Sequence, residues 1–143
     1  MKDPNKLHPW VRTKANELIA LCKANGISII ITQTLRTKAE QDALYAQGRT
    51  KPGSKVTNAK YPQSLHCWGI AFDFVPVIGG KAIWNKPEMF NRVGALGKSI
   101  GLAWGGDWAS FKDRPHFEAP NHTWKELQSK HGTPENYIKS WRE

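Results

Sequence analysis

The chain has 143 residues, which suits a single domain that can bury a hydrophobic core without disulfide bonds. Its formal net charge is +9, and it contains seven tryptophans but only two cysteines. This composition excludes a disordered chain and a disulfide-rich secreted scaffold, and no apolar run approaches the length of a membrane-spanning helix.

The first part of the chain predicts two helices with a buried strand between them. Apolar residues recur at helical spacing in residues 10–24: Val11, Ala15, Leu18, Ile19 and Cys22. A β-branched run over residues 27–31 predicts a strand, and Thr37 and Glu40 have the spacing of a capping box that opens a helix through Ala46. Because Cys22 lies on the apolar stripe, we expect a buried free thiol rather than a disulfide with Cys67.

The remainder predicts a long loop, short strands and three further helical segments. Residues 49–63 carry prolines and a glycine and indicate a loop. The other expected elements are a strand over 69–75, a helix over 87–100, a turn-rich segment over 104–108, a short strand over 115–119, a helix over 121–130 and a helical tail near Tyr137. We therefore predict one α+β domain over residues 1–143, with an antiparallel sheet, helices packed around it and an open cleft.

Two of the predicted strands each place a polar side chain opposite an aromatic one. Alternate residues of an extended segment share a face, so Asp73 falls opposite its phenylalanine neighbours. The small residues Gly69 and Ala71 share the face of Asp73 and leave space beside the carboxylate. His116 likewise falls opposite Phe117. This pattern indicates a polar cleft on one side of the sheet.

The cleft residues have the chemistry of a catalytic zinc site. His66 adds a second imidazole to His116 and the carboxylate of Asp73. Two imidazoles and a carboxylate are what a catalytic zinc ion takes from a protein when its fourth position stays open for water. Asp113, three residues before His116, is a candidate general base for that water. Each residue alone fits an ordinary structural role, but their joint spacing favours a zinc hydrolase.

The same residues resemble the motifs of the zinc D-Ala-D-Ala carboxypeptidase and L-alanyl-D-glutamate endopeptidase family of peptidoglycan peptidases, family M15. The motifs that carry the resemblance are Ser64-x-His66-x-x-Gly69-x-Ala71-x-Asp73 and Asp113-x-x-His116-Phe117-Glu118, with similar segments over 36–49 and 104–108. The pattern is most similar to the short phage endolysins of the endopeptidase branch. Carboxypeptidases of the family typically have glutamate at the position of Asp113, which favours that branch.

The resemblance implies roles for seven residues and one cofactor. It implies zinc ligands at His66, Asp73 and His116, a catalytic base at Asp113, and substrate-binding residues at Arg36, Gln41 and Ser64. The implied reaction is zinc-dependent hydrolysis of the L-alanyl-D-glutamate bond in peptidoglycan stem peptides, which causes bacterial lysis. Arg36 is expected to stabilise the oxyanion of that reaction.

Three other functions remain open. The first is a D-Ala-D-Ala carboxypeptidase or dipeptidase with the same fold. The second is a non-catalytic zinc-containing module that holds envelope polymers through its tryptophans and positive charge, although such a module does not need a base such as Asp113. Nucleic-acid binding rests on net charge alone, because no helix-turn-helix, zinc-finger or RNA-recognition pattern is present.

The positive charge and the polar beginning of the chain lead to expectations about partners and location. Every charged residue between Ala43 and Phe72 is basic. This segment either attracts anionic envelope polymers or is simply a solvated loop. Residues 1–9 do not resemble a secretory signal. We therefore expect a monomer that accumulates in the cytoplasm of an infected bacterium and reaches the wall through a membrane lesion made by a partner. We expect no separate cell-wall-binding domain, no membrane insertion and no specific nucleic acid.

Overall fold

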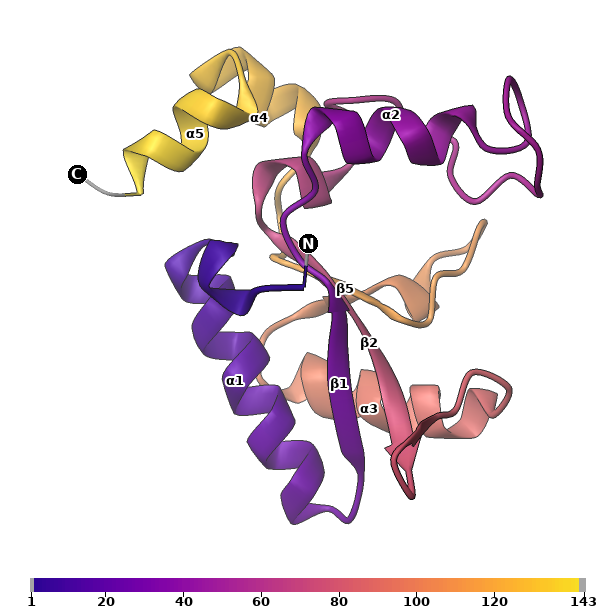
Figure 1. Cartoon of the computed structure of the whole chain (residues 1–143). Coiled ribbons are helices and arrows are strands. Elements are labelled where there is room, and N and C mark those ends of the chain that lie inside the picture. The colour runs from indigo at the N-terminus through magenta and orange to yellow at the C-terminus, as the bar shows by residue number, and fades with distance from the viewer. Residues whose placement is uncertain (1, 142–143) are drawn as a thin grey trace.

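An antiparallel sheet with the spatial order β1-β2-β5-β4 organises the molecule in the computed structural model, which describes residues 2–141 (Figure 1). The strands along this path are Ser28–Gln33 (β1), Ala71–Ile78 (β2), His116–Glu118 (β5) and Ala103–Trp104 (β4). A two-residue strand, Lys81–Ala82 (β3), pairs with β2 away from this path. The predicted α+β fold with an antiparallel sheet is confirmed.

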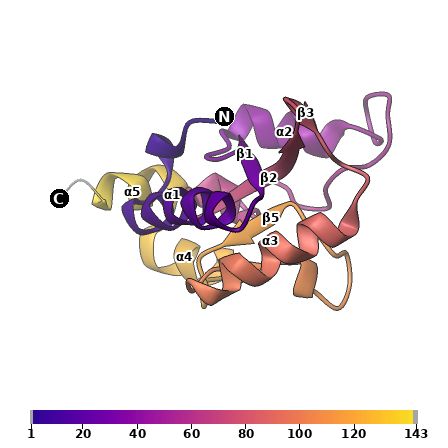
Figure 2. The same ribbon diagram turned by 90° about the horizontal axis from the view of Figure 1, so that it is seen from below.

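Helices lie around the sheet and at its ends. They are Pro9–Ala24 (α1), Lys38–Ala46 (α2), Pro87–Ser99 (α3), Trp124–His131 (α4) and Pro134–Ser140 (α5), with short 3-10 helices at Pro4–Lys6 (η1), Leu65–Trp68 (η2) and Gly105–Asp107 (η3). Helices α1 and α3 contact each other and the strands (Figures 1 and 2). Helix α2 lies beyond one end of β1 (Figure 1). No helix among residues 2–141 is long and apolar enough to cross a membrane.

Three phenylalanines form the part of the core that lies behind the polar face of the sheet. Phe72, Phe74 and Phe117 are fully buried. The ring centroid of Phe117 lies 5.6 Å from that of Phe72 and 5.3 Å from that of Phe74. Helix α3 packs closely on this cluster, since a Cβ at Gly97 would collide with the Phe117 ring. Burying each ring stabilises the fold by about 1.5–3 kcal/mol.

The register between β2 and β5 places the polar residues on the opposite face. Phe72 pairs with Phe117, and Asp73 pairs with His116. Because paired residues of an antiparallel ladder point to the same side and their neighbours to the other, the aromatic core fixes Asp73 and His116 side by side. The alternation predicted from the sequence is therefore confirmed for both strands.

Several element boundaries differ from the predicted ones for local reasons. Strand β2 begins at Ala71 instead of residue 69, because Gly69 has a φ of 72° and ends η2. Helix α4 begins at Trp124 instead of residue 121, since Thr123 caps it and Asn121 has a φ of 65°. The predicted turn-rich segment over 104–108 contains part of β4 and all of η3.

Other local predictions are confirmed. The capping box of α2 has both bonds: the Glu40 amide donates to Thr37 Oγ1 at 3.1 Å, and the Thr37 amide donates to the Glu40 carboxylate at 2.9 Å. Cys22 and Cys67 are both free and buried. Burial raises the pKa of each thiol to about 11, so both stay protonated at neutral pH.

Candidate active site

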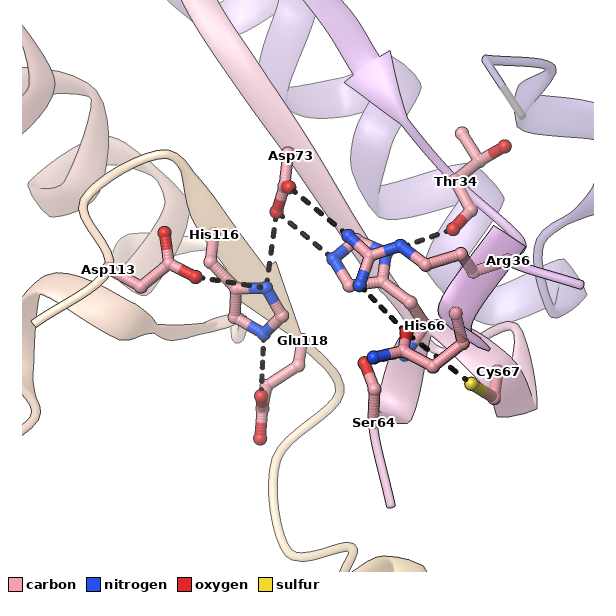
Figure 3. Close-up of polar contacts among 10 residues, drawn as sticks. Thr34, Arg36, Ser64, His66, Cys67, Asp73, Asp113, His116 and Glu118 are labelled. Atoms are coloured by element: carbon pink, nitrogen blue, oxygen red, sulfur yellow. Dashed lines mark hydrogen bonds and ion pairs between the residues drawn. The ribbon is translucent and has the colours of Figure 1, made fainter. Parts of the chain in front are cut away.

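His66 is held by a short helix whose two ends are both fixed. Ser64 caps η2, accepting a hydrogen bond from the His66 amide at 3.3 Å, and Gly69 ends it in the left-handed conformation. The His66 ring is buried, and its Nδ1 lies 2.9 Å from the Thr34 carbonyl oxygen (Figure 3). Because a carbonyl only accepts, Nδ1 carries the proton and Nε2 is left free to face Asp73.

His116 is oriented in the same way by a different partner. Its Nε2 lies 2.7 Å from Oε1 of Glu118, and its Nδ1 lies 3.2 Å from Oδ1 of Asp73 (Figure 3). His66 Nε2 lies 3.1 Å from the same Asp73 oxygen. The three ligand atoms, from η2, β2 and β5, therefore lie within 4.8 Å of one another.

The three residues strongly shift one another's pKa values. Burial would raise the pKa of Asp73, but the two imidazoles outweigh it and hold that pKa well below its usual range. Burial lowers the pKa of His66. For His116, burial is outweighed by hydrogen bonds to Asp73 and Glu118, which raise its pKa to about 10. The centre keeps an ionised carboxylate at all ordinary pH values.

This donor set fits a zinc ion. Two imidazole nitrogens and one carboxylate oxygen are the common protein ligands of catalytic zinc, and three ligands leave a position for water. Each imidazole donates its other N–H to an oxygen, as metal-ligating histidines almost always do. His66, Asp73 and His116 would hold the ion, while the Thr34 carbonyl and Glu118 orient the rings.

Asp113 lies at the edge of this centre rather than within it. Its Oδ2 is 4.0 Å from Nδ1 of His116, and its side chain is 45% exposed. Its backbone is tightly held, because the amide donates to the Gly105 carbonyl at 3.0 Å and a Cβ at Gly105 would collide with the Asp113 carbonyl. Burial raises the pKa of Asp113, as expected for a base poised to take up a proton.

Arg36 and Gln41 form a connected pair, and only Arg36 faces the cleft. Arg36 Nη2 lies 3.8 Å from Oδ2 of Asp73, and its Nη1 donates to the Gln41 side-chain oxygen at 3.0 Å. Gln41 is 0% exposed and donates to the Ala59 carbonyl at 2.7 Å. The expectation that Gln41 contacts substrate is therefore replaced by a supporting role behind Arg36.

A cleft of about 640 Å³ opens over these residues. Among the predicted site residues, the cleft is lined by Arg36, Ser64, His66, Asp73, Asp113 and His116, and Gln41 does not line it. Trp108 also lines the cleft, with its ring centroid 5.2 Å from that of His116. The structure thus brings six of the seven predicted residues to one surface.

Glu118 and the Thr34 carbonyl, which contact the two histidine rings, were not predicted to have a role. Glu118 lies two residues after His116 on the same strand, so strand alternation puts both side chains on one face. That signal was sufficient to find Glu118. The Thr34 carbonyl has no signal in the sequence, because any residue type supplies a backbone oxygen.

Comparison with known sequences gives consistent matches. The sequence profile of a family described as D-alanyl-D-alanine carboxypeptidase matches residues 57–119. The chain is 41% identical over 127 residues to the peptidoglycan L-alanyl-D-glutamate endopeptidase CwlK of Bacillus subtilis strain 168, covering 82% of this chain and 76% of that protein. It is 34% identical over 116 residues to an L-alanyl-D-glutamate peptidase of a Listeria phage, covering 80% of this chain but only 38% of the phage protein.

Solved structures show the same fold at low sequence identity. The L-Ala D-Glu endopeptidase ChiX of Serratia marcescens matches with a TM-score of 0.63 and 19% identity, covering 87% of this chain and 86% of ChiX. The vancomycin-resistance D,D-pentapeptidase VanY, solved in complex with Zn(II), matches with a TM-score of 0.62 and 16% identity, covering 92% of this chain and 83% of VanY.

Proposed function

The chain belongs to the M15 peptidase family, and on that premise we propose that it is a zinc-dependent endopeptidase that hydrolyses the L-alanyl-D-glutamate bond of peptidoglycan stem peptides. Two relatives, CwlK and the phage enzyme, are named for that bond. The observation that carries the proposal is the convergence of His66, Asp73 and His116 within 4.8 Å, beside Asp113, in an open cleft.

The residues of the cleft divide the chemistry among them. His66, Asp73 and His116 would hold a zinc ion, which would lower the pKa of a water molecule toward neutrality and so make that water a nucleophile. Asp113 accepts the proton of the attacking water and returns it to the leaving amine. Arg36, held by Gln41, stabilises the negative charge that develops on the carbonyl oxygen, a contribution of about 3 kcal/mol in sites of this kind.

Several structural features support a hydrolytic role over simple binding. Asp113 is fixed through its backbone but keeps a partly exposed carboxyl, so the group is held in place yet accessible. Its oxygen is too far from His116 for a hydrogen bond, at 4.0 Å. A carboxylate that only stabilised the fold would be expected to make a shorter contact, whereas a general base must leave room for water.

We further propose how the protein meets its substrate. The net charge of +9 and the basic loop over residues 49–63 attract anionic envelope polymers. The protein acts as a monomer, accumulates in the cytoplasm of an infected bacterium and reaches the wall after the membrane has been opened. Lysis of the host then follows from loss of peptidoglycan cross-linking strength.

One soluble substrate separates endopeptidase from carboxypeptidase activity. The pentapeptide L-Ala-D-Glu-L-Lys-D-Ala-D-Ala, γ-linked at glutamate, contains both bonds. We expect the zinc-loaded protein to release L-alanine and a tetrapeptide that begins at D-glutamate. Release of the terminal D-alanine instead would assign the carboxypeptidase reaction. Chelator-treated protein and the Asp113→Ala variant are the controls, and both should leave the pentapeptide intact.

A further inference from the structure

A second hollow of about 1000 Å³ continues from the catalytic cleft along the surface. The two hollows have several lining residues in common, including Val56, Trp108, Asp113 and Trp124, so one ligand can occupy both. We call this second hollow the aromatic groove. Beyond the shared residues, it is lined by Asn58, by Phe111 and by three lysines: Lys55, Lys112 and Lys125.

Phe111 has both a surface position and a backbone conformation that folding alone does not favour. Its side chain is 82% exposed, so it contributes little hydrophobic stabilisation. Its φ is 54°, in the left-handed region that bulky residues rarely adopt. Such a conformation costs free energy and tends to occur at ligand-binding positions. A phenylalanine presented in this way indicates a binding role.

Two tryptophans continue the aromatic surface toward the catalytic centre. Trp108 is 38% exposed and packs its ring near His116, with a centroid distance of 5.2 Å. Trp124 is half-buried against the core, so its ring is held in place. Fixed aromatic rings beside a catalytic cleft are suited to flat apolar faces, such as the C–H faces of sugar rings.

The charge of the groove is almost entirely positive. Among the described residues that line it, three are lysines and the carboxyl of Asp113 is the one acidic group. The Lys125 ammonium lies 5.9 Å from the Trp124 ring centroid, so a cation and an aromatic face are presented together. Lysines donate hydrogen bonds to acetamide, hydroxyl and carboxylate oxygens and do not accept them. The groove therefore suits a ligand with sugar rings and many acceptor oxygens.

We propose that the aromatic groove binds the glycan strand that carries the scissile stem peptide. This inference rests on the proposed function, because it places the sugar in covalent continuity with a peptide in the catalytic cleft. The N-acetylated sugar rings pack on Phe111 and Trp108, and their acetamide and hydroxyl oxygens accept from Lys112 and Lys125. The enzyme thus recognises the glycan as well as the bond that it cuts.

The test compares one peptide with and without sugar. The substrates are the free tetrapeptide L-Ala-D-Glu-L-Lys-D-Ala and the same peptide attached to the disaccharide of N-acetylglucosamine and N-acetylmuramic acid. We expect Phe111→Ala to lower kcat/KM roughly three- to tenfold on the disaccharide-peptide and to leave it unchanged on the free peptide. Phe111→Tyr should keep most of the wild-type kcat/KM on the disaccharide-peptide, because it keeps the aromatic ring.

Matched surface variants separate the groove from general effects. Trp84 is 58% exposed and lies outside both hollows, so Trp84→Ala should leave kcat/KM unchanged on both substrates. The double variant Lys112→Gln with Lys125→Gln should lower kcat/KM more on the disaccharide-peptide than on the free peptide. Lys81→Gln should change kcat/KM on neither. Equal losses on both substrates, or no loss on either, would overturn the glycan assignment.

A binding measurement keeps the inference separate from the catalytic proposal. Peptide-free glycan chains are titrated against the wild type and Phe111→Ala, with tryptophan fluorescence as the readout. Loss of glycan binding in Phe111→Ala supports glycan binding in the aromatic groove. If neither peptide is cleaved, that result refutes only the proposed function and leaves this binding result standing. Unchanged glycan binding, with lost binding of purified teichoic acid, would overturn the inference in favour of an anionic wall polymer.

Discussion

The carboxylate of Glu118 lies 2.7 Å from Nε2 of His116, on the side of the ring away from Asp73. This contact fixes the proton on Nε2 and leaves Nδ1 to face the metal position. We predict that Glu118→Gln lowers zinc affinity about 10- to 100-fold, as loss of such orienting partners typically does. Competition with a fluorescent chelator measures the affinity. Glu126→Gln, an exposed acid on α4, is the control and should keep wild-type affinity.

Asp113 should be required for turnover but not for zinc. Its carboxyl lies outside the three converging ligand atoms, so removing it leaves the metal site complete. We predict that Asp113→Ala lowers kcat about 10²- to 10⁴-fold while metal analysis still finds one zinc per chain. Loss of zinc together with activity would instead make Asp113 a ligand. Asp107→Ala, which removes an exposed acid paired with Lys98, should be nearly neutral.

Gln41 should act through Arg36. Its buried side-chain oxygen accepts from Arg36 and from the Cys67 thiol, and its amide donates to the Ala59 carbonyl, so Gln41→Ala leaves all three groups without this partner. We predict a loss of about 1–3 kcal/mol in the free energy of unfolding and a lower kcat. In a double-mutant cycle with Arg36→Ala, the two effects on kcat should be strongly non-additive. Additive effects would show that Gln41 does not position Arg36.

Gly69 and Gly26 form a matched pair for testing the support of His66. Both have left-handed φ values, 72° and 77°, but a Cβ at Gly69 would collide with Trp141, whereas one at Gly26 would meet nothing within 4 Å. Gly26→Ala should lower the free energy of unfolding by about 1–2 kcal/mol, because an alanine is strained in the left-handed conformation but meets no other atom there. Gly69→Ala should cost more and also weaken zinc binding, because Gly69 ends the helix that carries His66. Equal costs in urea unfolding would contradict the close packing of Trp141.

The Tyr61 hydroxyl should make stability fall at alkaline pH. It donates to the Glu135 carboxylate at 2.9 Å, and burial together with this carboxylate raises its pKa. A raised folded-state pKa means that the stabilisation is present below the ordinary tyrosine pKa of about 10 and is lost as the pH rises above it. We predict that Tyr61→Phe is less stable than the wild type at pH 8 and that the difference shrinks by pH 11. A constant difference in Tm would argue against this ionisation.

Periodicity and spacing were sufficient to predict the parts of the site that depend on regular structure. Asp73 and His116 lie in strands, where alternation fixes the face of each residue once Phe72 and Phe117 are assigned to the core. The capping box of Thr37 and Glu40 likewise depends only on residues three apart. Such local rules transfer directly from sequence to structure.

Other features depend on contacts between distant parts of the chain. Gly69 was predicted to leave space beside Asp73, but it ends η2 before the strand begins and packs against Trp141 from the C-terminal region. Gln41 was expected at the substrate, but helix α2 turns it inward to meet Arg36 and Ala59. No spacing rule contains these contacts, because they follow from how separate elements pack.

The soluble products released from purified peptidoglycan identify the bond that the protein cuts. Walls are digested with the zinc-loaded protein and with a chelator-treated sample, and the products are identified by mass spectrometry. We predict peptides that newly begin at D-glutamate in the zinc-loaded digest and their absence from the chelated control. Release of D-alanine alone, or identical products in both digests, would contradict this prediction.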